Sequence, residues 1–143
     1  MADQGQSIFS QYTFGTAIGI ALLSLAPHAF LLPQPSLQFA SILVSVIAGV
    51  YFGFAVSGGT TAQQLTELFV AMMFGLAAFL GVLWSAWFLP LSYLTHAVWD
   101  LAHHNRFRLK LVAIPQWYVP WCATIDIIVG LGLIAVWRHS GVL

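Results

Sequence analysis

The sequence predicts an all-α fold: a polytopic transmembrane helix bundle of about five spans, with its N-terminus in the cytoplasm. Of the 143 residues, 60% are hydrophobic and only 6% are charged, whereas soluble domains carry roughly a quarter charged residues. The mean hydropathy is +0.91. This composition excludes a soluble globular enzyme, a disordered chain and a nucleic-acid-binding protein, which would need a basic surface.

Breaks in the apolar pattern divide the chain into spans. We expect one domain, residues 1–143, with spans at about 12–32, 37–56, 64–82, 88–104 and 119–137. Pro27 interrupts the first span, and a Gly- and Thr-rich turn at 57–61 follows the second. The apolar stretch 65–104 is too long for one span, so we expect it to fold back at about 83–88. Pro90 then lies in the first helical turn, where its missing N–H is tolerated.

The cationic residues predict the orientation of the bundle. Three of the four Lys and Arg residues, Arg106, Arg108 and Lys110, fall in the loop between the fourth and fifth spans, and Arg138 ends the fifth span. Five spans place this loop on the same side as the N-terminus. The positive-inside rule therefore places both in the cytoplasm.

Small residues recur at helical spacing in the first three spans. Such stripes let helices approach closely in a bilayer. We expect these to pack within the bundle, and a homo-oligomer interface is the alternative. The stripes are Gly15 with Gly19, Gly49 with Gly53, and Ala71 with Gly75 and Ala78.

Three of the four acidic residues fall inside predicted spans: Glu67, Asp100 and Asp126. A carboxylate in hydrocarbon costs roughly 2.5–3.5 kcal/mol even on lenient insertion scales. Each of these carboxylates therefore needs a bonding partner or a functional role. This is the strongest functional signal in the sequence.

The fourth span carries the densest set of polar residues. On a helix, His96, Asp100 and His103 fall within an arc of roughly 60°, and His104 lies at its edge. Such a ligand set suits zinc, iron or manganese, and it equally suits a proton relay in which Asp100 sets the histidine tautomers. Trp99, which lies within this motif, is expected to line a pocket wall.

The fifth span adds Cys122 and Asp126, which lie one turn apart on one helix face. The fourth span ends and the fifth begins at the same membrane face, and Glu67 lies near that face at the start of the third. Six side chains can therefore converge in the cytoplasmic half of the bundle: Glu67, His96, Asp100, His103, Cys122 and Asp126. The alternative is a polar network that only joins helices, although Ser, Thr, Asn and Gln are the usual residues for that purpose.

Two motifs support a resemblance. The sequence reads H-x-x-W-D-x-x-H-H over 96–104 and W-Y-x-P-x-C-x-x-x-D over 117–126. This pair resembles a family of small bacterial integral membrane proteins whose function is uncharacterised. The resemblance implies a membrane bundle of this size, located in the bacterial inner (cytoplasmic) membrane, and supplies no activity.

The leading functional hypothesis is a membrane-embedded metal site that acts on a lipophilic substrate from the bilayer. The predicted metal ligands are His96, Asp100, His103 and His104. The predicted acid–base residues are Glu67, Asp100 and Asp126, and Trp99 and Cys122 are predicted to contact a cofactor. As an enzyme, the protein would be a metal-dependent oxidoreductase or an isomerase that uses acid–base chemistry.

Two other classes compete with this hypothesis. One is a proton- or ion-conducting oligomer, or a subunit that holds haem or a pigment through histidine. The other is a structural accessory subunit that meets a partner's helices. The only lysine, Lys110, lies in a loop, which argues against a retinal Schiff base.

Overall fold

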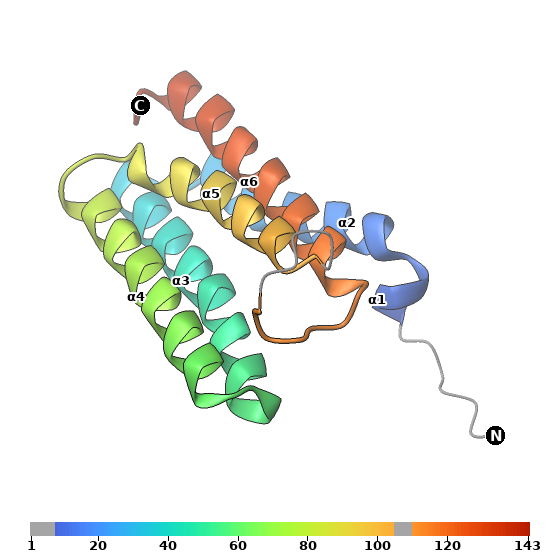
Figure 1. Cartoon of the computed structure of the whole chain (residues 1–143). Coiled ribbons are helices and arrows are strands. Elements are labelled where there is room, and N and C mark those ends of the chain that lie inside the picture. The colour runs from blue at the N-terminus through green and yellow to red at the C-terminus, as the bar shows by residue number, and fades with distance from the viewer. Residues whose placement is uncertain (1–7, 105–109) are drawn as a thin grey trace.

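A computed structural model describes residues 8–104 and 110–143, and all regular structure within these ranges is helical (Figure 1). The elements are α1 (Ile8–Gln11), α2 (Thr13–Leu25), the 3₁₀ helix η1 (Ala26–Ala29), α3 (Pro33–Gly58), α4 (Thr61–Leu83), α5 (Phe88–Ala102) and α6 (Tyr118–Ser140). The predicted all-α fold class is thereby confirmed.

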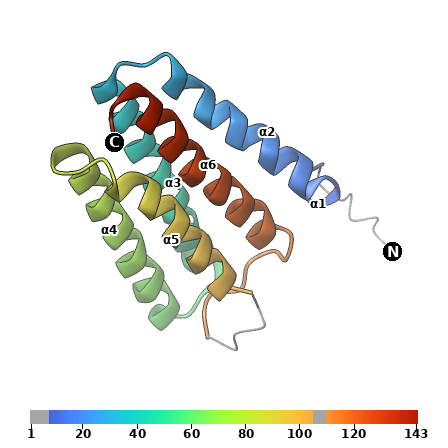
Figure 2. The ribbon, with the colours of Figure 1, turned by 90° about the horizontal axis from the view of Figure 1, so that it is seen from above.

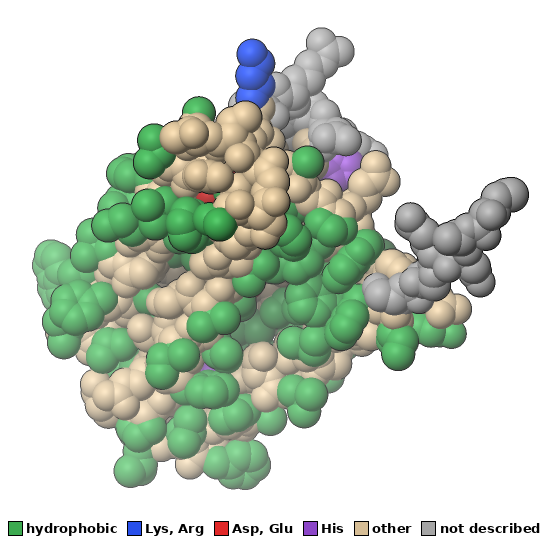
Figure 3. All heavy atoms as spheres, turned by 90° about the horizontal axis from the view of Figure 1, so that it is seen from below, with side chains coloured by type: hydrophobic (Ala, Val, Ile, Leu, Met, Phe, Trp, Pro, Cys, Tyr) green, Lys and Arg blue, Asp and Glu red, His purple; other side chains and the backbone are tan. Residues whose placement is uncertain are grey.

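Three helices are long and apolar enough to cross a membrane: α3 with 26 residues, and α4 and α6 with 23 each. Two others are shorter, since α2 has 13 residues and α5 has 15. Hydrophobic side chains cover much of the face in Figure 3, and a Lys or Arg side chain appears there only at one edge. Three helices of this kind indicate that the chain associates with a membrane.

The helix ends differ from several of the span limits expected from the sequence. Pro27 lies in η1, so α2 ends at Leu25 instead of continuing to 32. Because Pro is well suited to the first turn of a helix, α3 begins at Pro33 and not at 37. The fold-back lies before Phe88, and Pro90 is in the first turn of α5, as predicted.

The helices run back and forth between two ends of the bundle (Figure 2). The α3–α4 turn, the segment before α6 and the start of α2 lie at one end, and η1, the α4–α5 turn and the C-terminus lie at the other. α3 packs on α4, and α6 packs on both α5 and α2. α5 also contacts α3 and α4. It therefore occupies the centre of the bundle, where its polar residues meet those of its neighbours.

The glycines of the small-residue stripes do not make the close helix contacts, whereas Ala78 of the third stripe is fully buried in the core, as predicted. Among the described residues, a Cβ atom added at Gly15, Gly19, Gly49, Gly53 or Gly75 would meet nothing within 4 Å. By contrast, a Cβ at Gly130 of α6 would lie 2.9 Å from Leu94 Cγ and 3.1 Å from the Pro90 carbonyl oxygen of α5. The packing role expected of those glycines is therefore wrong within one chain, and their role in a homo-oligomer stays a prediction.

Candidate metal centre

Four potential metal ligands face one another across the α5–α6 contact. His96 and Asp100 lie one turn apart on α5, and Cys122 and Asp126 lie one turn apart on α6. One ligand atom from each residue can be chosen so that all four lie within 4.8 Å of one another, and all four residues are buried. This group can hold a metal ion.

The contacts within the group centre on the His96 imidazole. His96 Nδ1 is hydrogen-bonded to Asp126 Oδ2 at 2.7 Å and lies 3.5 Å from Asp100 Oδ1. Cys122 Sγ lies 4.0 Å from the same Asp126 Oδ2. One imidazole nitrogen is thus shared between two carboxylates, with the thiol beside them.

Tyr51 of α3 completes this group, although it was not among the site residues predicted from the sequence. Its hydroxyl donates to Asp100 Oδ1 at 2.5 Å. The available signal was general: a buried tyrosine hydroxyl requires a partner, and the apolar span around Tyr51 offers few. The sequence did not show which helix would supply that partner.

A second polar group lies beside the first and joins α4 to the end of α5. His103 Nδ1 donates to the Trp99 backbone carbonyl at 3.0 Å, so it carries a proton. His103 Nε2 lies 2.9 Å from Glu67 Oε1, and Trp99 Nε1 donates to Glu67 Oε2 at 3.3 Å. Because Nδ1 is already protonated, the contact between Nε2 and Oε1 holds one further shared proton.

The single site predicted from the sequence is therefore two adjacent groups. His103 pairs with Glu67, outside the four-residue group. The ring of Tyr51 lies between the two groups, with its centroid 4.4 Å from that of His103 and 5.6 Å from that of His96. Trp99, whose contact with a cofactor stays a prediction, donates from Nε1 to Glu67 Oε2.

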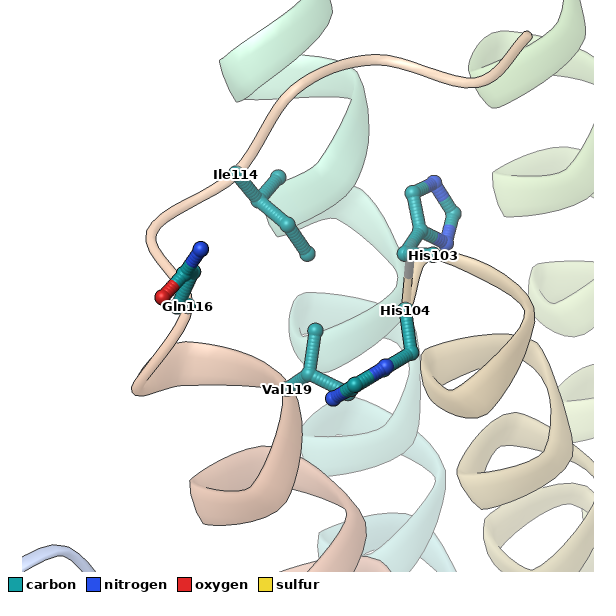
Figure 4. Close-up of a pocket in the computed structure, with 5 residues that line it drawn as sticks. All are labelled: His103, His104, Ile114, Gln116 and Val119. Atoms are coloured by element: carbon teal, nitrogen blue, oxygen red, sulfur yellow. The ribbon is translucent and has the colours of Figure 1, made fainter. Parts of the chain in front are cut away.

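His104 does not join either group. α5 ends at Ala102, so the chain leaves the helix before His104 and the side chain is exposed. Figure 4 shows His103 and His104 with Ile114, Gln116 and Val119 around a pocket of about 300 Å³ at this end of the bundle. His103 thus connects this pocket to buried Glu67.

The electrostatics of the four-residue group favour a cation. Within residues 8–104 and 110–143, the ion pairs of Asp100, Asp126 and Glu67 are all with histidines, and none is with Lys or Arg. Asp100 Oδ2 and Asp126 Oδ1 are buried without a hydrogen-bond partner. Buried carboxylate oxygens without a donor or cation are strongly destabilising.

Another buried histidine lies at the opposite end of the bundle. His28 Nδ1 lies 2.7 Å from Ser36 Oγ, which also accepts from Trp137 Nε1 at 2.9 Å. No Asp, Glu or Cys takes part in these contacts. His28 therefore serves as an internal comparison for His96: both are buried, and of the two only His96 has ion pairs with carboxylates among residues 8–104 and 110–143.

Comparison with known proteins gives a family. A protein-family model described as "Family of unknown function (DUF6010)" matches residues 12–141 of the chain. The chain belongs to this family. The match covers every helix from α2 to α6 and hence both polar groups. No curated protein and no solved structure matched the chain.

Proposed function

We propose that this DUF6010 member is an integral membrane protein that binds one divalent transition metal through His96, Asp100, Cys122 and Asp126. The observation that carries the proposal is the convergence of these four buried residues, with ligand atoms within 4.8 Å of one another. In a tetrahedral site with bonds of about 2.0–2.3 Å, neighbouring ligand atoms lie roughly 3.3–3.8 Å apart. A small movement of the side chains would therefore bring them to bonding distance.

The charge of the group supports a divalent ion. Such an ion would neutralise the carboxylates of Asp100 and Asp126, for which the described residues supply no Lys or Arg. His96 Nδ1 lies closest to both carboxylates, so an ion held by all four residues would replace the proton on this nitrogen. The Cys122 thiolate favours zinc or iron over manganese, which prefers oxygen ligands.

A metal-free acid–base site is the second candidate, and the observation that favours it is the short contact between His96 Nδ1 and Asp126 Oδ2, 2.7 Å. In that case the imidazole and the two carboxylates would share protons. The Glu67–His103 pair would deliver protons from the pocket in Figure 4. A lipophilic substrate is compatible with both candidates and stays a prediction.

Metal analysis of the purified protein separates the two candidates. We expect one equivalent of metal in the wild type, its loss in His96→Ala, and its retention in His28→Ala. The last variant removes another buried histidine at the opposite end of the bundle. His104→Ala should also retain the metal, because this side chain is exposed. A wild type without metal after purification and metal titration would contradict the proposal.

We also propose that α2, with η1, and α5 cross the membrane together with the three longer helices, giving five crossings. The alternating directions of α2 to α6 in Figure 2 support this count. Arg106, Arg108 and Lys110 would then mark the cytoplasmic face. A cysteine placed at Lys110 in a Cys122→Ser background should react with an impermeant thiol reagent from the cytoplasmic side; reaction from the opposite side would contradict this orientation.

A further inference from the structure

A pocket of about 360 Å³ lies between α2 and α3, and it is bounded by α6 and by Tyr93 of α5. Its volume falls within the range of about 300–1,000 Å³ found for small-molecule pockets. Over the described residues, α2 packs on α6 and has no comparable contact with α3. The space between α2 and α3 is therefore not filled by direct packing of these helices.

The chemistry of the lining selects a neutral, apolar occupant. None of the lining residues is charged. The polar atoms of two aromatic lining residues already have partners, since Tyr93 donates to the Ala40 carbonyl at 3.0 Å and Trp121 Nε1 donates to Thr16 Oγ1 at 3.1 Å. Ser24 and Tyr118, which also line the pocket, carry hydroxyl groups, but no lining residue offers a charged partner. A charged ligand would therefore lose its solvation here without compensation. A hydrocarbon chain would not.

The position of the pocket allows access from the bilayer. Val46 of α3 is a lining residue, and 61% of its surface is exposed. A lipid that moves sideways from the hydrocarbon core into this pocket passes from one apolar medium to another, so the hydrophobic effect contributes little. Selective binding must therefore come from shape and from a polar group at one end of the ligand.

One lining residue belongs to the four-residue group. Cys122 lines the pocket, and its sulfur lies 4.0 Å from Asp126 Oδ2. The apolar pocket and the candidate metal centre thus meet at this side chain. A ligand that fills the pocket can place one end against Cys122, whereas His96, Asp100 and Asp126 are fully buried behind it and do not line the pocket.

We propose that this pocket binds a neutral single-chain lipophile, with its hydrocarbon chain between α2 and α3 and its small polar end at Cys122. The access route rests on the proposed placement in a membrane. Because the polar end lies at Cys122, it would also be the ligand that the proposed metal receives. The ligand is therefore an uncharged lipid with a compact oxygen-containing head group. A diacyl phospholipid does not match, because its charged head group would have no counterpart in the lining.

The test is photolabelling in phosphatidylcholine vesicles with a long-chain primary alcohol that carries a diazirine, followed by peptide mapping. We expect labelling of lining segments of α2, α3 and α6 that an excess of unlabelled alcohol suppresses. Val46→Trp, which fills the pocket from α3, should reduce the suppressible labelling several-fold. Val98→Trp is the matched control, because Val98 of α5 is similarly exposed, at 66%, and lies outside the lining.

Ser24→Leu fills the pocket from α2 and should have the same effect as Val46→Trp, which guards against misfolding of either variant. Labelling that excess alcohol does not suppress, or that both filling variants leave unchanged, would overturn the proposal. Metal content is measured on the same samples. Suppressible labelling of a metal-free protein would reject the metal centre and keep the pocket, whereas bound metal with unsuppressed labelling would reject the pocket alone.

Discussion

At the scale of single residues, the Tyr51 hydroxyl connects α3 to the candidate metal centre. This hydroxyl donates to Asp100 Oδ1 at 2.5 Å, and Tyr51 is itself buried. A hydrogen bond of this kind fixes the orientation of a ligating carboxylate and delocalises its charge. Tyr51 is therefore a positioning residue, which acts on the metal through Asp100.

We predict that Tyr51→Phe weakens metal binding by about 10–100-fold, the usual effect of removing a partner of a metal ligand. Tyr93→Phe is the control, since the Tyr93 side chain is equally buried and its hydroxyl donates to a backbone carbonyl on α3. That variant should lose about 0.5–1.5 kcal/mol of stability and keep its metal affinity. Competition with a chelator measures both affinities, and equal affinities for the two variants would remove the role given to Tyr51.

Glu67 gives a second prediction at this scale. Glu67→Ala leaves His103 Nε2 and Trp99 Nε1 without their acceptor, so we expect a stability loss of about 3–5 kcal/mol. The metal content should not change, because Glu67 is outside the four-residue group. Thermal unfolding and metal analysis in detergent measure the two effects.

Glu67→Gln, which keeps an acceptor oxygen, should be destabilised less. Loss of metal from a folded Glu67→Gln protein would show that the two polar groups form one site.

The parts of the site that could be predicted are those whose presence in an apolar span is costly. Asp100 and Asp126 stood out for this reason, and the helical spacing added His96 and Cys122. The assignment of His103 and His104 depended on a helix continuing to 104, whereas α5 ends at Ala102 and Glu67 takes His103 as its partner. Tyr51 was missed because a tyrosine in an apolar span does not by itself indicate a site.

At the scale of helices, the approach of α5 to α6 brings the two halves of the candidate metal centre together. Gly130 lies one turn beyond Asp126 on α6, and the Pro90 carbonyl and Leu94 side chain of α5 occupy the space beside it. The stripes at Gly15 and Gly49 were predicted by spacing alone. The spacing of small residues shows that one face of a helix lacks large side chains. It does not show which neighbouring helix packs against that face, so the contact at Gly130 was not predicted.

We predict that Gly130→Ala destabilises the protein by about 1–3 kcal/mol through overpacking and lowers its metal affinity by separating α5 from α6. Gly19→Ala has no atom to displace in the part of the chain that the structure describes and should be neutral or slightly stabilising, because Ala is the better helix former. Unfolding midpoints in detergent measure the difference. A neutral Gly130→Ala would show that the helices are less closely packed than described, and a change of oligomeric state in Gly19→Ala would support the predicted homo-oligomer.

At the scale of the whole molecule, the two polar groups and the pocket of Figure 4 lie in the half of the bundle that contains the α3–α4 turn and the start of α6. The length of the apolar stretch 65–104 predicted this arrangement in outline. It requires a fold-back near Phe88, which sets the direction of α5 and hence the end of the bundle at which its histidines lie. The apolar pocket between α2 and α3 could not be predicted, because it depends on α2 packing against α6, the last helix in the chain.

X-ray absorption spectroscopy at the edge of the bound metal tests the central claim most directly. The proposed site has one sulfur ligand, Cys122, the only cysteine in the chain. We predict one sulfur scatterer at about 2.3 Å with nitrogen and oxygen scatterers at about 2.0–2.2 Å, and loss of the sulfur signal in Cys122→Ser. Stoichiometric metal with nitrogen and oxygen ligands only, unchanged in Cys122→Ser, would contradict the proposed site.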